Sequence, residues 1–235
     1  MKDFYSRTAM VLGEEAVETL KTKRVAVFGI GGVGGHCAEA LVRAGIGEID
    51  LIDHDTVVES NLNRQLFAVR SQLGRLKVDA AEERLLDINE ELIVHKHPVF
   101  YLPDQKGDII LSDYDYVIDC IDTVSAKIDI ITDAIRQKIP VISSMGCGNR
   151  IDPSMLAITD LFQTKNDPLA RVMRHELRKR NITKLDVICS SETPVHITGT
   201  NEEEPKKRYP GSTAFVPSAA GIMLASYTVR RMLGL

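Results

Sequence analysis

The chain has 235 residues, of which 44% are hydrophobic and 26% are charged, as is ordinary for a globular protein. This length is enough for one large domain, or for one domain with an appendage. The formal net charge of -4 argues against an overall basic protein that coats DNA. Tryptophan is absent and aromatic residues make up 5% of the chain, so platforms for stacking nucleic-acid bases are scarce.

The cysteines and the N-terminus indicate the compartment. Cys37, Cys120, Cys147 and Cys189 are scattered, and no two of them form a C-x-x-C pair. The N-terminal residues MKDFYSRT lack the apolar core of a secretory signal. We therefore expect a cytoplasmic protein with reduced thiols.

The first part of the chain predicts one βαβ unit. Residues 5–20 have apolar residues at helical spacing and predict a short amphipathic helix, in which Arg7 is an isolated charge. Residues 25–30 form an apolar run rich in β-branched residues, which predicts a buried strand. A helix over residues 36–45 and a second strand over residues 48–53 follow.

A glycine cluster joins the first strand to its helix. Gly29, Gly31 and Gly34 have the G-x-G-x-x-G spacing, and Asp53 ends the second strand. Such glycines allow a tight turn close to a phosphate, and the first N–H groups of the helix attract an anion. A carboxylate at the end of the second strand can accept ribose hydroxyl groups. The unit therefore predicts nucleotide binding; the alternative is a purely structural turn.

Strands and helices continue to alternate up to Gly148. A polar loop over residues 56–76 precedes a helix over residues 77–89, whose apolar residues recur at helical spacing. The other expected elements are strands over residues 92–100, 114–122 and 140–148, and a helix over residues 125–138 capped by Ser125. This alternation predicts an α/β fold, Rossmann-like and doubly wound, with a mostly parallel sheet.

The pattern is less regular after Gly148. We expect strands over residues 155–162 and 186–191, a helix over residues 168–182 that begins with Pro168, and a mobile loop over residues 192–212. Residues 213–229 carry no charge and predict a buried core helix, with peripheral membrane association as the alternative. We expect residues 1–150 to form a nucleotide-binding core. Residues 151–235 would form a C-terminal extension of mixed strands and helices, packed on the same domain.

Several polar residues separate this chain from hydride-transferring nucleotide-binding proteins. An arginine and a lysine at a phosphate site neutralise charge on a transferring group and on a departing pyrophosphate. An acid at the end of the fourth strand can hold Mg²⁺ together with substrate phosphates. The residues concerned are Asp53 with Asp55, the loop residues Asn61, Asn63, Arg64 and Gln65, and the later residues Lys77 and Asp122.

These motifs together resemble the ATP-binding core of the ubiquitin-activating superfamily. The resemblance covers roughly residues 7–148, through GIGGVGG, DHDTVVESNLNRQ, GRLKVDAA and DCIDTVSAK. That superfamily includes bacterial enzymes that adenylate sulfur-carrier proteins. It implies attack of a carboxylate on the α-phosphate of ATP, which gives an acyl-adenylate and pyrophosphate.

The resemblance implies roles for individual residues. It implies that Arg64 and Lys77 bind the phosphates and that Asp122 holds Mg²⁺. It also implies that Arg7 crosses a homodimer interface onto the ATP of the partner subunit, so that these four residues are the catalytic set. The implied nucleotide-binding residues are Gly29, Gly31, Gly32, Gly34, Asp53, Asp55, Asn61, Asn63, Arg64, Gln65, Lys77 and Asp122.

The C-terminal part resembles one branch of that superfamily. Enzymes that adenylate sulfur carriers usually carry two C-x-x-C pairs for structural zinc; this chain has none, so we expect no zinc. NDPLARVMRHELRKRNI and EEEPKKRYPGSTAFVPSAAG are instead similar to the branch that acts on tRNA, the threonylcarbamoyladenosine dehydratases. This implies ATP-dependent cyclisation of that nucleoside in tRNA, with ATP and Mg²⁺ as cofactors and a monovalent cation as a further candidate. The implied partners are tRNA and a second copy of the chain, with a sulfur-relay or electron-transfer protein as a further candidate and no DNA. The resemblance thus implies that residues 1–150 are the ATP-binding adenylation core and that residues 151–235 bind the tRNA substrate and dimerise.

A basic helix is the candidate surface for tRNA. Arg171, Arg174 and Arg178 share one face at helical spacing, and Lys179 follows them. Such a stripe can neutralise backbone phosphates. The alternative is a solvated helix paired to nearby acids. Residues 206–208 form a second basic group, which the acidic residues 202–204 weaken.

Three other functions stay open from the sequence. Adenylation of the C-terminus of a small sulfur-carrier or ubiquitin-like protein is disfavoured by the missing C-x-x-C pairs. A nicotinamide-dependent oxidoreductase has no need of Arg64, Lys77 and Asp122. A non-catalytic nucleotide-binding partner would have lost phosphate-loop residues, which are intact here. We expect Cys189 to be a buried small apolar residue, because no activating base stands near it in the sequence.

Overall fold

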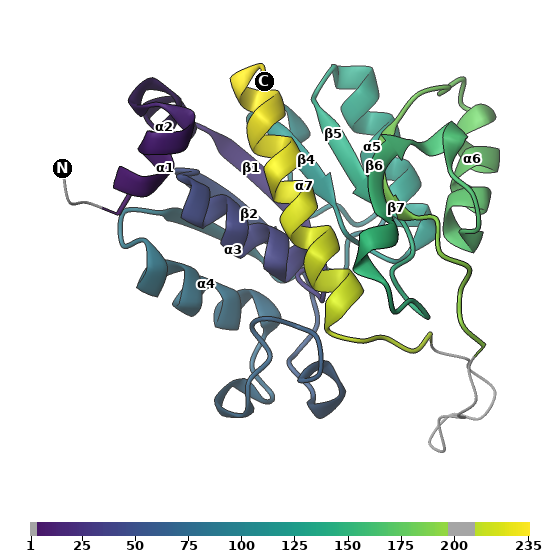
Figure 1. Cartoon of the computed structure of the whole chain (residues 1–235), viewed down its shortest axis with the longest axis horizontal. Helices are drawn as coiled ribbons and strands as arrows, with labels where there is room; N and C mark the ends of the chain where they lie inside the picture. Colours follow the sequence, from purple (N-terminus) through teal and green to yellow (C-terminus); the bar gives the residue numbers. More distant parts are fainter. Residues whose placement is uncertain (1–3, 197–209) are drawn as a thin grey trace.

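The computed structural model describes residues 4–196 and 210–235. They form a seven-stranded sheet of order β3-β2-β1-β4-β5-β7-β6 (Figure 1). Neighbouring strands are parallel except for β6 and β7, which are antiparallel. The predicted Rossmann-like, mostly parallel α/β fold is confirmed. The strands are β1 (Arg24–Phe28), β2 (Glu48–Ile52), β3 (Ile93–His97), β4 (Tyr116–Asp119), β5 (Val141–Ser144), β6 (Leu156–Asp160) and β7 (Asp186–Ser190).

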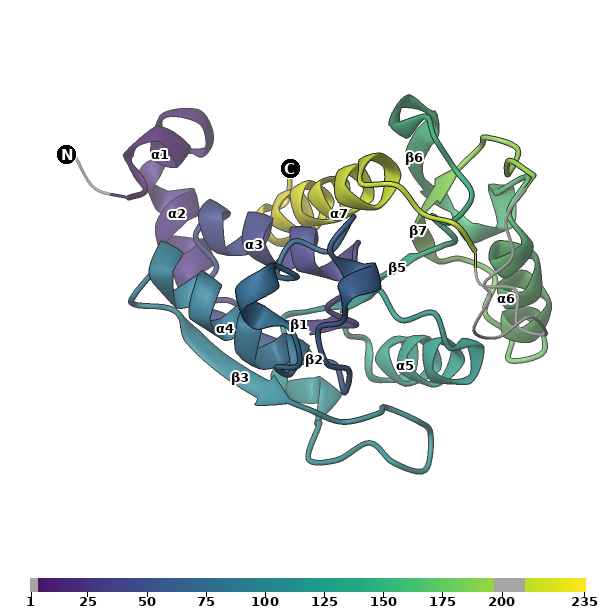
Figure 2. The ribbon, with the colours of Figure 1, turned by 90° about the horizontal axis from the view of Figure 1, so that it is seen from below.

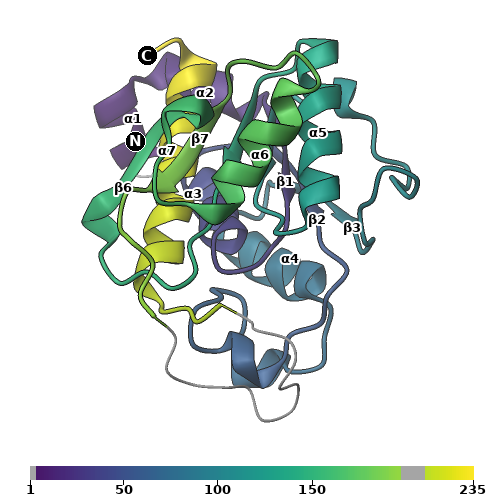
Figure 3. The same cartoon turned by 90° about the vertical axis from the view of Figure 1, so that its right-hand side faces the viewer.

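Helices cover both faces of this sheet, as Figures 2 and 3 show. One face packs against α3 (Gly34–Ala44), α4 (Lys77–Ile88) and α7 (Phe215–Leu233). The other face packs against α5 (Val124–Gln137) and α6 (Pro168–Arg178). The short helices α1 (Ser6–Leu12) and α2 (Glu14–Lys21) precede β1. Residues after 150 extend the same sheet, since β7 pairs with β5 and β6 pairs with β7.

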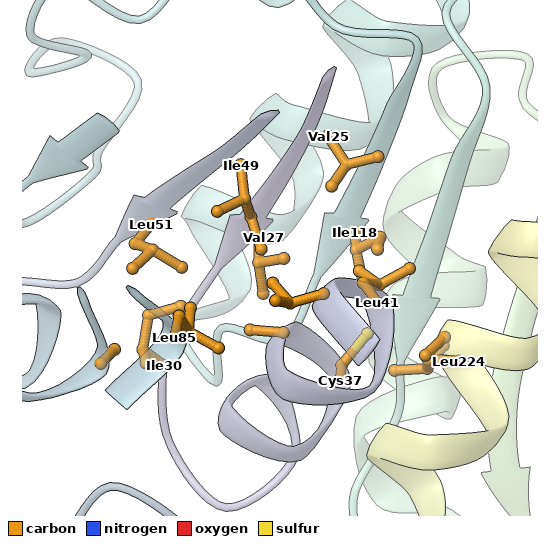
Figure 4. Packing of buried hydrophobic residues seen from close by; sticks show 14 of the residues in the cluster. Val25, Val27, Ile30, Cys37, Leu41, Ile49, Leu51, Leu85, Ile118 and Leu224 are labelled. Atoms are coloured by element: carbon orange, nitrogen blue, oxygen red, sulfur yellow. The ribbon is translucent and has the colours of Figure 1, made fainter. Parts of the chain in front are cut away.

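The central strand β1 is buried from both sides. Alternate residues of a strand point to opposite faces. Val25 and Val27 pack in the cluster that contains α3 residues such as Leu41 (Figure 4), whereas Ala26 and Phe28 pack in the cluster that contains α5 residues. This packing on both faces fixes the position of Phe28, which directly precedes the glycine turn.

The C-terminal helix α7 is a core element, as predicted. Ala220 and Leu224 are fully buried in the cluster that includes α3. The two helices approach so closely that a Cβ atom on Gly221 would lie 2.3 Å from the carbonyl oxygen of Val33. Within residues 4–196 and 210–235, no helix combines the length and the apolar character that crossing a bilayer requires.

Some element boundaries differ from the predicted ones. Gly13, with φ of 96°, divides the N-terminal helix into α1 and α2. Thr123 stands at the N-cap of α5 without a side-chain cap, so the predicted Ser125 cap is wrong. Helix α7 includes Pro217 in its first turn, where a missing N–H costs the helix no internal hydrogen bond. The predicted mobile loop and the basic group 206–208 fall largely or wholly outside the described residues.

Candidate active site

A cleft lies at the carboxyl ends of the parallel strands, where α/β sheets bind ligands. It has a volume of about 360 Å³ and is bounded by the glycine turn, the loop between β2 and α4, and the ends of β4 and β5. Figure 1 shows the blue loops between β2 and α4 at the lower edge of the molecule. The expected nucleotide-binding residues that line it are Gly29, Gly31, Gly32, Asp53, Asp55, Asn61, Arg64, Gln65, Lys77 and Asp122.

Three expected residues do not line this cleft. Gly34 begins α3, where a Cβ atom would lie 1.8 Å from the carbonyl oxygen of Gly29, so it permits the turn to close. Asn63 is exposed and supports its neighbour Arg64 from outside. Arg7 is exposed on α1, which lies away from the loops that carry Arg64 (Figure 1).

Asp53 braces the glycine turn. Its Oδ2 accepts a hydrogen bond of 2.7 Å from the Ile30 amide, and its Oδ1 accepts one of 2.9 Å from the Asp55 amide. These charge-assisted bonds hold the segment after β1 against the segment after β2. Each carboxylate oxygen has a second lone pair, so Asp53 can accept a ribose hydroxyl as well.

Lys77 and the two acids form one charged cluster in the cleft. Lys77 begins α4, and its Nζ lies 2.6 Å from Asp55 Oδ2 and 4.0 Å from Asp53 Oδ2. Its side chain is only 8% exposed, and a buried ammonium group requires such partners. Asp55, which was expected near the ribose, therefore pairs with the lysine that was expected on the phosphates.

Arg64 is held by its own loop. Its Nη1 donates to the carbonyl of Ser60 and to Asn63 Oδ1, both at 2.8 Å. Gly32 lies beside it, since a Cβ atom there would be 3.4 Å from Arg64 Cγ. Burial lowers the pKa of the guanidinium, although an arginine stays charged in proteins. A positive group thus stands next to the glycine turn.

A buried ion pair supports the turn that carries Asp122. Lys127 Nζ lies 2.9 Å from Asp119 Oδ2, and neither side chain is exposed. Lys127 also donates to the Ile121 carbonyl at 2.9 Å, and Ser143 Oγ donates to Asp119 Oδ2 at 2.6 Å. Asp122 itself is exposed at the cleft. Sequence reasoning assigned Lys127 no role, although it ends the motif DCIDTVSAK.

Sequence reasoning also missed part of the cleft wall. The rings of His54 and Phe100 lie 4.5 Å apart and form an aromatic surface there. The available signal was their position, because His54 directly follows the second expected strand and Phe100 ends the third. Residues far along the chain complete the wall, namely Cys147, Gly148, Pro210, Gly211, Ser212 and Pro217.

The cysteines have the properties of structural residues. Cys189 is 6% exposed, and burial raises its pKa to about 12, so its thiol is protonated at neutral pH. Burial likewise raises the pKa of Cys147 to about 11. The expectation of a buried apolar cysteine at position 189 is confirmed.

The basic helix α6 divides its cations between internal contacts and solvent. Arg174 is half-buried and donates to the carbonyl and the hydroxyl of Thr164. Lys179 is exposed and lies 2.7 Å from Glu176. Arg171 is exposed, and Arg178 is exposed over the ring of Phe162 at 5.2 Å. Arg174 and Lys179 thus already have polar partners within the protein. Arg171 and Arg178 are the exposed arginines of the expected stripe.

Comparison with known proteins gives matches over almost the whole chain. The profile of the ThiF family matches residues 5–235. The tRNA threonylcarbamoyladenosine dehydratase of Bacillus subtilis (strain 168) is 41% identical over 239 residues, which cover 97% of this chain and 94% of that protein. The dehydratase of the same name from Escherichia coli (strain K12) is 35% identical over 249 residues, covering 97% and 93%.

A solved structure agrees with both matches. The E. coli tRNA N6-threonylcarbamoyladenosine dehydratase in complex with ATP has a TM-score of 0.88 and 34% sequence identity, and the match covers 98% of this chain and 93% of that one. Fold and sequence thus agree over almost the whole chain. The chain belongs to the ThiF family, in the group of the tRNA threonylcarbamoyladenosine dehydratases.

Proposed function

We propose that this chain catalyses the ATP-dependent cyclisation of threonylcarbamoyladenosine in tRNA through an acyl-adenylate. The observation that carries the proposal is the end-to-end match to two bacterial dehydratases of that name. It is supported by a cleft that brings Arg64, Lys77 and Asp122 to the glycine turn. Full-length similarity of this kind favours the dehydratase over adenylation of a carrier protein.

ATP fits the cleft in size and charge. A volume of about 360 Å³ is within the range of small-molecule sites. The phosphates lie at the glycine turn and the start of α3, where backbone N–H groups and the helix dipole attract an anion. Asp53 receives the ribose, and Lys77 exchanges Asp55 for the phosphates. The aromatic pair His54 and Phe100 forms a wall against which a base can pack.

Mg²⁺ fits at Asp122. Its carboxylate is exposed in the cleft and accepts a long hydrogen bond of 3.5 Å from the Thr123 hydroxyl. A single carboxylate with substrate phosphates is a usual Mg²⁺ environment. When bound, the ion neutralises phosphate charge. Arg64 and Lys77 stabilise the negative charge that develops on the α-phosphate and on pyrophosphate.

The proposed reaction requires no nucleophile from the enzyme, because both attacking groups belong to the substrate. An oxygen of the threonine carboxylate bonds to the α-phosphorus, and pyrophosphate leaves. A nitrogen or oxygen of the carbamoyl group then bonds to the activated carbonyl carbon, AMP leaves with the former carboxylate oxygen, and the nucleophile loses a proton. The nucleoside loses one water, and ATP becomes AMP and pyrophosphate. Because both groups belong to one nucleoside, proximity accelerates the closure.

The proposed reaction transfers neither sulfur nor electrons, so none of its steps requires a sulfur-relay or electron-transfer partner. A monovalent cation has no step in it either. The four cysteines are free thiols, which suits the reducing cytoplasm.

The direct test uses the purified full chain with ATP, Mg²⁺ and tRNA that carries the linear modification. Nucleoside mass spectrometry is expected to show conversion to the dehydrated product, with AMP and pyrophosphate released in equal amounts. ATP cleavage that requires an added sulfur-carrier protein, with no change in the tRNA, would support the alternative function. Binding of NADH in preference to ATP would exclude both.

We also propose that Arg7 acts on the ATP of a partner subunit. Arg7 is exposed and does not line the cleft of its own chain. Neighbouring residues on α1 are apolar and strongly exposed, with Met10 at 85% and Val11 at 83%, which suits a subunit interface. In a mixture of Arg7→Ala and Arg64→Ala chains, heterodimers would regain one intact site. No recovery of activity in such heterodimers would place Arg7 outside the reaction.

A further inference from the structure

His36 stands where three segments of the cleft meet. It is the third residue of α3 and is half-buried. Its Nε2 lies 2.9 Å from Ser218 Oγ, in the first turns of α7 and 182 residues later in the chain. The main chain of Arg64 also interacts with this ring, and by itself that interaction would raise the pKa of His36. One side chain therefore contacts both the phosphate loop and the C-terminal helix.

The surrounding packing leaves little room for these segments to shift. A Cβ atom on Gly221 of α7 would lie 2.8 Å from His36 Cβ. On the other side, a Cβ atom on Gly32 would lie 3.2 Å from Pro217 Cβ and 3.4 Å from Arg64 Cγ. The start of α7, the glycine turn and Arg64 are thus in mutual contact around the imidazole.

The contact with Ser218 defines the tautomer of the imidazole. Burial lowers the pKa of His36, and the interaction with the Arg64 main chain opposes this only in part, so the ring is neutral at neutral pH. A neutral imidazole has one donor and one acceptor nitrogen. The hydroxyl of Ser218 donates its one hydrogen to the Ala214 carbonyl, so Nε2 of the imidazole is the donor towards Ser218 Oγ.

We propose that His36 is a positioning residue that ties the Arg64 loop to α7 and keeps the guanidinium at the glycine turn. The proposal rests on the proposed function, in which Arg64 acts on the ATP phosphates. A second connection runs the same way: Asn63 Nδ2 donates to the Ser212 carbonyl at 3.0 Å, and Asn63 Oδ1 accepts from Arg64. The C-terminal segment thereby holds both the main chain and the guanidinium of Arg64.

The first experiment compares three variants of the full chain. His36→Phe keeps a ring of similar volume and removes the polar contacts with Ser218 and with the Arg64 main chain, whereas Ser218→Ala removes only the hydrogen bond to α7. Thr228→Val is the control, because Thr228 is also buried on α7 but its hydroxyl has no partner in the described chain. We expect His36→Phe to lower kcat for adenylate formation about threefold to tenfold, the size of one or two hydrogen bonds, with a smaller change in KM for ATP. Thr228→Val should match the wild type.

The second experiment repeats His36→Phe in an Arg64→Ala background. If His36 acts through Arg64, the substitution adds no further loss there. An equal loss in both backgrounds, or a wild-type kcat for His36→Phe, would overturn the proposal. If a denaturation control shows that His36→Phe does not fold, Ser218→Ala replaces it, and its effect on kcat is measured in the wild-type and Arg64→Ala backgrounds. An equal loss in both backgrounds, or no loss in either, would again overturn the proposal. Failure of the proposed function is distinguishable, because the wild type would then form no adenylate.

Discussion

The ammonium of Lys77 lies 2.6 Å from the carboxylate of Asp55, inside the cleft that we assign to the ATP phosphates. The lysine is 8% exposed and the aspartate is 50% exposed, so the acid is the partner that is free to move. Asp55 compensates the charge of Lys77 when no phosphate is present. ATP binding then exchanges one anion for another beside the same buried cation.

This exchange predicts opposite effects of two substitutions. Lys77→Met should weaken ATP binding and slow adenylate formation, because the cation that stabilises the phosphates is lost. Asp55→Asn should tighten ATP binding a few-fold, since it removes a like charge beside the phosphates. Isothermal titration with ATP measures both. Weaker binding by Asp55→Asn would show that Asp55 contacts the nucleotide directly.

Arg64→Ala should slow adenylate formation by roughly 2.7–4 kcal/mol of lost transition-state stabilisation, about a hundredfold to a thousandfold. Arg64 is partly buried against Gly32 and is held in place by Ser60 and Asn63, so no other side chain of that loop can replace it. ATP–pyrophosphate exchange measures the loss. Arg70→Ala is the matched control, because Arg70 is 80% exposed further along the same loop. An unchanged rate for Arg64→Ala would remove Arg64 from the phosphate site.

Asp122→Ala should abolish the Mg²⁺ dependence of turnover together with most of the activity. The reason is that its exposed carboxylate is our candidate ligand in the cleft. The measurement is a titration of activity against Mg²⁺ concentration. Asp104→Ala, which changes an exposed acid outside the cleft, serves as the control. A variant with normal activity and a normal Mg²⁺ curve would show that Asp122 is not a metal ligand.

Lys127→Met should lower the free energy of unfolding by about 3–5 kcal/mol, because it leaves the buried charge of Asp119 unpaired. Lys23→Met is the comparison, since Lys23 lies 2.8 Å from Asp115 at a partly exposed site. That pair should contribute less than about 1 kcal/mol. Urea denaturation measures both variants. Equal effects would mean that the Asp119–Lys127 pair does not brace the fold.

The tRNA surface is tested at the two exposed arginines of α6. Arg171→Glu combined with Arg178→Glu should weaken tRNA binding and flatten its salt dependence, because fewer phosphates are neutralised. ATP affinity should not change, since neither residue lines the cleft. Arg136→Glu on α5, where Arg136 is 71% exposed, is the control. Filter binding at several salt concentrations gives the result, and unchanged tRNA affinity would make the stripe an ordinary solvated face.

The sequence was most informative where the relevant residues are close in the chain. Periodicity and glycine spacing located β1, α3 and β2, because these elements depend on local side-chain patterns. It was less informative at helix ends, where Thr123 rather than Ser125 precedes α5. The antiparallel direction of β6 was also invisible, because strand direction depends on which neighbour the strand pairs with.

The sequence alone predicted the α/β class, the glycine turn with Asp53, and the cations and acid that we assign to a nucleoside triphosphate. Each of these is encoded in residue type and short spacing. Three contacts are visible only in the folded chain: Lys77 faces Asp55, Lys127 braces the turn of Asp122, and His36 contacts Ser218. Those contacts join residues up to 182 positions apart, and packing rather than local pattern brings such residues together.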